Sequence, residues 1–430
     1  MMKAKVITLG CKVNQYESEA MLSSLLQHGF AAAEDKETAD VVILNSCTVT
    51  AESDRKVRQI FRRAKKDNPD AVMVLTGCMA QAFPEDARRL EEADIILGTS
   101  NRKRLVPDLL AFLSARQRII DIAPHTNDEK FENLNVENFT GRTRAFVKIE
   151  DGCNRFCSYC IIPYARGRVR SKPLEDLKAE LAGLGANGYK EVVLTGINLS
   201  AYGQEFGLHL CDAIEAACAT PGIERVRLGS LEPEQLSEDV IQRMAKQKKL
   251  CPQFHLSLQS GCDATLKRMN RHYTADEYRT IVRNLRAAFE NAAITTDIMV
   301  GFAGETNEEF AESLAFAEEI AFAKVHVFAY SRRPGTRAYD MGDQLTNAVK
   351  EARSHEMIRV TTATQQAFFK AQISRTEEVL FEREIQKGVW EGYSMNYTPV
   401  AVASGTSLAG EIRSVRIESC TDTHCMGTVL

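Results

Sequence analysis

Short apolar runs alternate with charged, helix-like stretches along the first hundred residues. Apolar runs of strand length occur four times, at 5–10, 40–46, 71–77 and 93–99. The stretches between them, such as 18–29 and 54–67, repeat their apolar residues with a helical period. This alternation predicts a parallel sheet with helices on its faces, and we assign residues 1–123 to this α/β domain.

The pattern changes twice after this domain. Residues 124–141 are polar, rich in asparagine and without a period, which predicts a linker. From 142 to 370, six apolar runs that are each followed by a helical stretch predict six βα units. After an amphipathic helix at 350–373, five short β-like runs predict a small antiparallel barrel over 372–430. We therefore expect an α/β multidomain protein with three unequal parts.

Composition agrees with this organisation and adds one anomaly. A chain of 430 residues is long enough for about three domains of ordinary size. With 44% hydrophobic and 26% charged residues, it is typical of a globular protein, which excludes collagen-like and largely disordered chains. The formal net charge of −4 gives no general attraction to nucleic acid, so an RNA surface would need local clusters of Lys and Arg. The anomaly is the presence of 12 cysteines.

The chemistry of these cysteines depends on the compartment. The first residues lead directly into a β-like run without an apolar signal segment, and no run approaches the ~18 apolar residues that span a bilayer. We expect a cytoplasmic protein with reduced thiols and no membrane partner. Most single cysteines are small buried core residues, and we keep that interpretation for six of them: Cys211, Cys218, Cys251, Cys262, Cys420 and Cys425.

Three other cysteines directly follow the first three predicted strands. Cys11, Cys47 and Cys78 end the segments TLGC, LNSC and LTGC. Because the carboxyl ends of parallel strands share one edge of a sheet, these thiols are expected to converge. Three convergent thiolates suit an iron–sulfur cluster or a zinc ion with one open position, and three small core residues are the alternative. The first loop reads GCKVNQ and lacks the glycines of a GxGxxG dinucleotide site.

The remaining three cysteines form a single CxxxCxxC motif. Cys153, Cys157 and Cys160 follow the β-like run at 145–152. All three can reach one iron–sulfur cluster, and three protein ligands leave one iron free to bind a small chelating molecule. The alternative is a zinc knuckle with a distant fourth ligand, but no His or Cys follows at the spacing of a zinc finger.

The two sets of cysteines together resemble the radical S-adenosylmethionine (SAM) methylthiotransferase family. The segments TLGCKVNQYESE (8–19), TGCMAQ (76–81) and DGCNRFCSYCIIPYARGRVRSK (151–172) are most similar to one branch of it. That branch acts on N6-threonylcarbamoyladenosine at the position 3′ of the tRNA anticodon (position 37). The alternatives within the family are branches that act on isopentenyladenosine in tRNA or on a ribosomal protein.

The resemblance implies a fold, an activity and two cofactors. Residues 142–370 would form a partial TIM-type (β/α)6 radical SAM barrel, and 372–430 a TRAM-type β-barrel. The enzyme would methylthiolate C2 of the modified adenosine through a 5′-deoxyadenosyl radical derived from SAM. Two [4Fe–4S] clusters are implied. Cys153, Cys157 and Cys160 would hold the catalytic one. Cys11, Cys47 and Cys78 would hold an auxiliary cluster that carries the sulfur, which a further SAM methylates.

An active site at the carboxyl ends of the barrel strands would bring further residues close to SAM and substrate. We assign a catalytic role to Asp297. For SAM binding we expect five residues that each could equally be structural: Gly196, Asn198, Glu232, Gln259 and Gly301.

Local charge suggests where RNA binds. Residues 141–173 carry eight Lys or Arg against two acidic residues, and 243–286 carry ten against three. We expect phosphate or substrate contacts from five arginines: Arg166, Arg168, Arg170, Arg332 and Arg333. The terminal barrel, with five basic and eight acidic residues, is expected either to orient other parts or to present one basic face.

The resemblance also implies partners. They are tRNA, a flavodoxin- or ferredoxin-like electron donor and a sulfur source, and a monomer is favoured. A hypothesis of another class is an RNA-binding protein whose iron–sulfur clusters sense redox state. Such a protein would bind RNA without producing 5′-deoxyadenosine.

Overall fold

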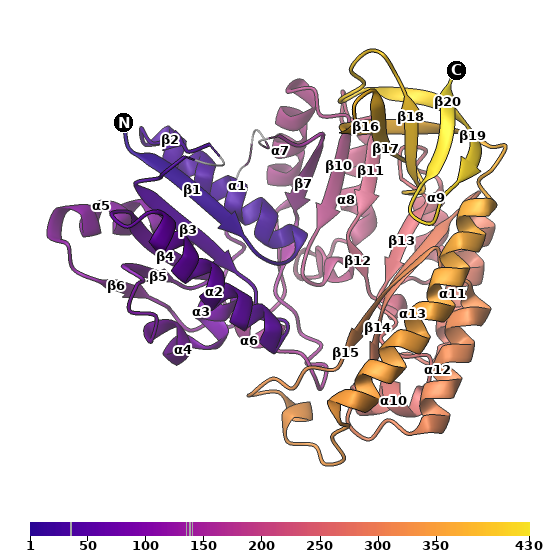
Figure 1. Ribbon diagram of the computed structural model, residues 1–430, viewed down its shortest axis with the longest axis horizontal. Helices are drawn as coiled ribbons and strands as arrows, with labels where there is room; N and C mark the ends of the chain where they lie inside the picture. The colour runs from indigo at the N-terminus through magenta and orange to yellow at the C-terminus, as the bar shows by residue number, and fades with distance from the viewer. Residues whose placement is uncertain (35–36, 135, 137–138, 140) are drawn as a thin grey trace.

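The computed structural model describes residues 1–34, 37–134, 136, 139 and 141–430. Figure 1 shows an N-terminal α/β domain, a central partial barrel and a small C-terminal barrel beyond the long helix α13. The predicted α/β multidomain organisation is confirmed. Within the described residues, none of the helices has the length and apolar character needed to cross a membrane.

The N-terminal sheet is parallel throughout and has the strand order β2-β1-β3-β4-β5-β6. Its central strands β3 and β4 are buried along their whole length, which explains their continuous apolar sequence. The strands are β1 (Lys3–Thr8), β2 (Ala31–Ala32), β3 (Val41–Ser46), β4 (Val72–Gly77), β5 (Ile95–Leu97) and β6 (Ile119–Asp121).

Helices cover both faces of this sheet. Apolar residues of α1 and α5 pack on one face, and those of α2, α3 and α4 pack on the other. The α2 helix begins after Thr50, whose side chain accepts a hydrogen bond from the Ser53 backbone N–H as an N-cap. The helices are α1 (Lys12–Gln27), α2 (Ala51–Asp67), α3 (Cys78–Ala82), α4 (Pro84–Arg88) and α5 (Leu105–Ala115), with the 3-10 turn η1 (Arg102–Arg104).

The predicted six βα units form a partial barrel of parallel strands. Its third strand is interrupted at Gly229, so β11 pairs with β10 while β12 pairs with β13. The strands are β7 (Arg144–Lys148), β10 (Glu191–Thr195), β11 (Arg225–Leu228), β12 (Ser230–Leu231), β13 (Gln253–Leu256), β14 (Ala293–Val300) and β15 (Lys324–Ala329). A two-stranded antiparallel ribbon of β8 (Glu150–Asp151) and β9 (Arg170–Ser171) flanks the CxxxCxxC loop.

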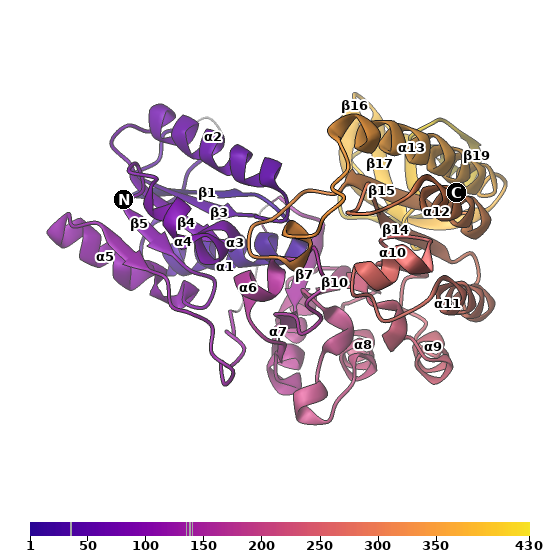
Figure 2. The ribbon, with the colours of Figure 1, turned by 90° about the horizontal axis from the view of Figure 1, so that it is seen from below.

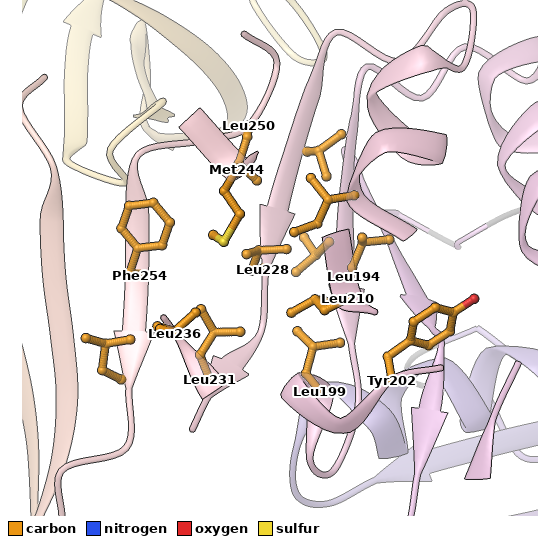
Figure 3. Close-up of a cluster of buried hydrophobic side chains, with 14 of the residues drawn as sticks. Leu194, Leu199, Tyr202, Leu210, Leu228, Leu231, Leu236, Met244, Leu250 and Phe254 are labelled. Atoms are coloured by element: carbon orange, nitrogen blue, oxygen red, sulfur yellow. The ribbon is translucent and has the colours of Figure 1, made fainter. Parts of the chain in front are cut away.

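Helices surround the barrel and bury its outer face. Figure 3 shows part of this core, where Leu228 and Phe254 of two strands meet Met244 of α9 and Leu250. The α11 and α12 helices both begin with a capping box, built on Thr274 and Thr306. The helices are α6 (Ile162–Arg166), α7 (Leu174–Ala186), α8 (Leu210–Ala219), α9 (Glu238–Ala245), α10 (Asp263–Arg268), α11 (Ala275–Ala288), α12 (Asn307–Ile320) and α13 (Asn347–Lys370). Four 3-10 turns complete the barrel: η2 (Leu199–Ala201), η3 (Gln204–Phe206), η4 (Pro233–Gln235) and η5 (Arg337–Tyr339).

The N-terminal domain lies beside β7, at one edge of the partial barrel, in both Figure 1 and Figure 2. The segment expected to be a linker is irregular, but it is not a free connection. Val136 and Phe139 are buried in the core of the barrel domain, and the carbonyl of Leu134 accepts a hydrogen bond from Tyr16 of α1. Four positions of this segment, 135, 137, 138 and 140, lie outside the described residues. The segment therefore helps to join the two domains.

The C-terminal part is a closed five-stranded barrel with the order β16-β17-β18-β20-β19. One pair departs from the antiparallel expectation, because β18 and β20 run parallel. The barrel packs its own small core, which includes Val379, Phe381 and Val415. Its strands are β16 (Thr376–Gln386), β17 (Val389–Ser394), β18 (Pro399–Ala403), β19 (Ile412–Cys420) and β20 (Cys425–Val429).

Candidate active site

The three strand-end cysteines lie at one edge of the N-terminal sheet. Cys11, Cys47 and Cys78 follow the adjacent strands β1, β3 and β4, so the fold brings them together as the sequence predicts. Gly10, with φ +111°, allows this approach, since a Cβ there would lie 2.9 Å from the Cβ of Cys47. The three thiols are free. Their role as cluster ligands stays a prediction.

Arg166 contacts this cysteine site from the barrel domain. Its Nε lies 3.2 Å from the Sγ of Cys78, and its Nη2 donates to Asn14 Oδ1 at 2.5 Å. Burial raises the pKa of the Cys78 thiol to about 12, and the Arg166 guanidinium opposes that shift. A positive group is therefore held against one of the candidate cluster ligands.

Arg166 belongs to a buried charge network between the two domains. The Glu17 carboxylate of α1 lies 2.5 Å from Arg166, 2.7 Å from Lys148 and 2.9 Å from Arg102. Burial alone would raise the pKa of Glu17, but these three cations outweigh it and hold the pKa at about 2. Asp151 completes the network through Lys148, at 2.5 Å. Every member is less than 3% exposed.

This network corrects part of the RNA-contact prediction. Arg166, Arg170 and Arg333 are buried, so none of them presents its charge to solvent. Arg170 donates to the Arg166 carbonyl and lies 3.4 Å from Glu129, whereas Arg333 pairs at 2.6 Å with Asp54, which reaches it from the N-terminal domain. Arg168 and Arg332 are exposed. RNA contact by these two arginines stays a prediction.

Cys153, Cys157 and Cys160 lie in the loop between the β8–β9 ribbon and α6. The loop turns sharply at Gly152, with φ +84°, where a Cβ would lie 1.9 Å from the carbonyl oxygen of Arg168. Glycine is therefore required for the ribbon to close beneath the loop. Burial raises the pKa of the Cys160 thiol to about 12.

Arg271, which sequence reasoning did not select, supports this loop. Its Nη1 lies 3.4 Å from the Sγ of Cys157, and its Nη2 pairs with Glu232 at 2.5 Å. Glu232, expected to bind SAM, is therefore bound to an arginine that contacts a candidate cluster ligand.

Neither cysteine set forms a site for a single metal ion. Among the described residues, no three His, Cys, Asp or Glu side chains are grouped closely enough to hold one ion. This disfavours the mononuclear zinc alternatives. Cysteines that bind different iron atoms of one cluster stand further apart than the ligands of one ion, so the donor sets fit iron–sulfur clusters.

Two cavities meet at Asp297. One, of about 160 Å³, lies beside Cys160 and is lined by Tyr159, Gln259 and Asp297 among others. The other, of about 720 Å³, extends from Cys11 into the barrel and is also lined by Asp297. The carboxylate of Asp297 lies 3.4 Å from His255 Nε2. One carboxylate thus borders both the space beside the loop cysteines and the space beside the strand-end cysteines.

Several expected SAM-binding residues carry unused polar atoms. Asn198 Oδ1 and Gln259 Oε1 are buried without a hydrogen-bond partner among the residues that the structure describes, as is Glu150 Oε1, whose other oxygen accepts from the Asn198 backbone N–H at 2.7 Å. Gly196 packs directly on Glu150, because a Cβ on Gly196 would lie 2.6 Å from Glu150 Oε2. Buried acceptors without donors fit a ligand that carries amino and hydroxyl groups.

Gly301 stands apart from these residues. A Cβ at this position would lie 2.5 Å from Cγ of Lys350, and its backbone N–H donates to Glu305 at 2.7 Å. It lines neither of the two cavities that Asp297 borders. Its role in SAM binding stays a prediction.

The larger cavity is lined by both polar and apolar groups, with two lysines among them. Lys12 stands beside Cys11 at the start of α1, and the inner side of the barrel strands adds His255, Lys324 and His326. The terminal barrel contributes Tyr397, which stacks on Tyr393 with ring centroids 4.6 Å apart. All three parts of the chain therefore form the wall of one chamber.

Two family models match the two segments of the chain that contain the cysteine sets. The sequence model of the uncharacterized protein family UPF0004 matches residues 3–98, and that of the radical SAM superfamily matches residues 147–317. The threonylcarbamoyladenosine tRNA methylthiotransferase MtaB of Bacillus subtilis (strain 168) is 36% identical over 416 residues, covering 95% of this chain and 92% of the relative. The chain belongs to the radical SAM methylthiotransferase family.

Relatives from two branches of the family match this methylthiotransferase almost equally well. The enzyme of the same name from Thermotoga maritima is 37% identical, covering 98% of this chain and 96% of the relative. A tRNA-2-methylthio-N(6)-dimethylallyladenosine synthase from Pelotomaculum thermopropionicum is 34% identical, covering 99% and 97%. Identity alone therefore does not separate the branches.

Solved structures support the fold of this methylthiotransferase. The radical SAM methyltransferase TsrM from Kitasatospora setae, solved with tryptophan and a SAM analogue, superposes with a TM-score of 0.59 at 15% identity, covering 79% of this chain and 75% of the other. The cobalamin-dependent radical enzyme OxsB gives 0.51 at 9% identity, covering 85% and 56%. At these identities the likeness concerns the fold alone.

Sequence reasoning missed several residues of the methylthiotransferase site. Lys12 could have been found, because it directly follows Cys11 in the first strand-end loop. Arg271 had no comparable signal, since it reaches Cys157 across 114 residues of sequence.

Five of the six cysteines set aside as core residues are buried, and Cys420 is half-buried.

Proposed function

We propose that this enzyme methylthiolates C2 of N6-threonylcarbamoyladenosine in tRNA. The observation that carries the proposal is the lining of the 720 Å³ cavity beside Cys11. Two lysines, Lys12 and Lys324, face it together with His255 and His326, against one carboxylate, Asp297; burial lowers the pKa of His326, so the proposal rests on the lysines. The threonylcarbamoyl group ends in a carboxylate, which cationic side chains stabilise, whereas an isopentenyl group would need an apolar wall.

The relatives support tRNA as the substrate class, because the names of both branches refer to a modified adenosine of tRNA. They do not separate the two substituents, and the two lysines of the cavity support the threonylcarbamoyl group. The branch that modifies a ribosomal protein is less favoured, since nothing in the cavity lining requires a peptide.

The cysteine sets fit two iron–sulfur clusters. When bound, SAM and the cluster of Cys153, Cys157 and Cys160 would supply the organic radical that activates C2, and the cluster of Cys11, Cys47 and Cys78 would supply the sulfur. An adenine C–H offers no acidic proton to a side-chain base, so the cofactors must carry this chemistry.

The protein's own residues hold and separate these groups. The unused oxygens of Asn198 and Gln259 would accept hydrogen bonds from SAM, and Arg271 would fix Cys157. Asp297, on the border of both cavities, would lie between SAM and the adenine. Tyr397 and Lys12 line the cavity that would hold the nucleoside.

The proposal is tested by mass spectrometry of tRNA nucleosides from cells that lack this chain. We expect the 2-methylthio derivative of threonylcarbamoyladenosine to disappear while its precursor accumulates. Expression of the wild type should restore it, whereas Cys157→Ala and Cys78→Ala should not. Cys218→Ala, a substitution in the barrel core, serves as the matched control and should restore the modification.

Three outcomes would contradict the proposal. Loss of the methylthio group from isopentenyladenosine would assign the enzyme to the other tRNA branch. A missing methylthio mass increment on a ribosomal protein, with tRNA unchanged, would assign it to the protein-modifying branch. The absence of 5′-deoxyadenosine from reduced, reconstituted protein incubated with SAM would support the redox-sensor hypothesis instead.

A further inference from the structure

Lys12 is a charged side chain without a counter-ion on the wall of the large cavity. Within the described part of the chain, its ammonium group makes no hydrogen bond or ion pair. The nearby carboxylate Glu191 is already engaged by Arg227 at 2.8 Å and by Arg144 at 3.7 Å. The side chain of Lys12 is exposed on the cavity wall, so its charge is available to an anion that enters the cavity.

The position of Lys12 in the fold does not give it a structural purpose. It is the first residue of α1, where the helix dipole disfavours positive charge and favours Asp or Glu. It does not cap the helix, and its side chain extends into the cavity rather than into the core of the N-terminal domain. The charge of Lys12 is therefore presented to what the cavity binds.

Lys12 also stands at a defined place relative to the reacting atoms. It directly follows Cys11, one of the predicted ligands of the sulfur-carrying cluster. In adenine, C2 and the N6 substituent flank N1 on the same edge of the ring. A nucleoside that presents C2 to the site of Cys11 therefore brings its N6 substituent close to the next residue of the chain.

Lys12 is better placed than the other charged groups of the cavity to bind the N6 substituent. Asp297 already faces His255, at 3.4 Å, and the rings of His255 on β13 and His326 on β15 lie 6.1 Å apart, on either side of β14. Lys324 begins β15 and lies on the barrel wall, whereas Lys12 comes from the N-terminal domain beside the cysteines. Of the two lysines that line the cavity, Lys12 is the one that adjoins the strand-end cysteines.

We propose that Lys12 binds the threonyl carboxylate of the substrate nucleoside and so selects it against adenosines with an uncharged N6 substituent. This inference rests on the proposed function and deepens it. The ammonium donates charge-assisted hydrogen bonds to the carboxylate and holds C2 of the adenine toward Cys11. No covalent step involves Lys12.

The test is a binding experiment on the reconstituted protein without SAM, so that no turnover occurs. Fluorescence anisotropy measures the affinity for three labelled anticodon stem-loops. They carry threonylcarbamoyladenosine, its carboxyl methyl ester or unmodified adenosine. The variants are Lys12→Met and Lys12→Arg, and Lys178→Met, on the exposed surface of α7, is the matched control. The visible absorption of the clusters verifies that every variant is loaded equally.

We expect Lys12→Met to weaken binding of the acid-bearing stem-loop by about tenfold or more, as the loss of a charge-assisted hydrogen bond predicts. The methyl ester should weaken wild-type binding to a similar degree and should bind Lys12→Met no worse than the acid does. Lys12→Arg should keep most of the preference, and Lys178→Met should equal the wild type.

Three outcomes would overturn the inference or its basis, and they are distinguishable. If Lys12→Met weakens all three stem-loops equally, Lys12 binds phosphate rather than the carboxylate. If wild type prefers the acid and Lys12→Met keeps that preference, another residue selects the carboxylate, and the proposed function stands. If wild-type protein shows no preference for the acid and methylthiolates only isopentenyladenosine, the proposed function itself fails.

Discussion

The Nε of Arg166 lies 3.2 Å from the Sγ of Cys78, and these two residues belong to different domains. The same guanidinium binds Glu17 at 2.5 Å, 149 residues away in the sequence. One buried side chain thus joins the barrel to the N-terminal sheet at the candidate cluster site.

Removal of the Arg166 charge should destabilise the interface between the domains. Arg166→Met leaves Glu17 with one cation fewer in a buried site, and we expect the free energy of unfolding to fall by about 3–5 kcal/mol. Chemical denaturation followed by circular dichroism measures this change. Arg62→Met, which removes an exposed partner of Glu92, should cost about 1 kcal/mol or less. Equal losses in the two variants would contradict a structural role for the network.

Glu17 should make stability depend on acid. Its pKa is lowered from 4.5 to about 2, so its contribution is present above about pH 4.5 and is lost as the pH falls toward 2. We expect the wild type to exceed Glu17→Gln by about 3 kcal/mol near neutral pH, with the difference closing over that window. Denaturation of cluster-free protein at several pH values measures it. Glu175→Gln, on an exposed side chain, should show no such change, and parallel curves for Glu17→Gln would refute the assignment.

The iron content should divide between the two cysteine sets. If each set holds a four-iron cluster, the reconstituted wild type contains about eight iron atoms per chain, and Cys78→Ala or Cys157→Ala retains about half. The double variant should lose nearly all of it. Colorimetric iron assay and Mössbauer spectroscopy measure these amounts, with Cys218→Ala as the control. Full iron content in Cys78→Ala would remove the strand-end cysteines from the predicted ligand set.

Arg227 should anchor the terminal barrel to the central one. It pairs with Glu191 at 2.8 Å and donates to the backbone carbonyl of Met395 at 2.9 Å. Arg227→Met leaves both partners unsatisfied, so the terminal barrel should dock less firmly. Limited proteolysis between α13 and β16 should proceed about tenfold faster, which corresponds to the loss of a charged hydrogen bond.

Arg283→Met serves as the matched control for this experiment, since Arg283 is exposed on α11. Its cleavage rate should equal that of the wild type. An unchanged rate in Arg227→Met would show that other contacts, such as Arg225 with the Glu378 carbonyl at 2.8 Å, suffice to dock the barrel.

The parts of the site that follow local rules were predictable from sequence. Cys11, Cys47 and Cys78 end apolar runs, and the geometry of parallel strands alone brings such positions to one edge. The burial of Arg166 was not predictable, because its charge is neutralised by Glu17 of another domain rather than by a neighbour in sequence. Local counts of Lys and Arg therefore overestimated the basic surface. The parallel pairing of β18 with β20 likewise depends on barrel closure, which short β-like runs do not encode.

The buried network around Glu17 limits how this protein can be rebuilt. The N-terminal domain supplies Glu17 of α1 and Arg102 of η1, whereas the barrel supplies one anion, Asp151, and two cations, Lys148 and Arg166, so the barrel half alone carries excess positive charge. A chimera that joins this barrel to the N-terminal domain of another enzyme would bury Lys148 and Arg166 without the Glu17 carboxylate unless Glu17 were transplanted with it. Recombination between such enzymes is therefore constrained to exchange both domains together.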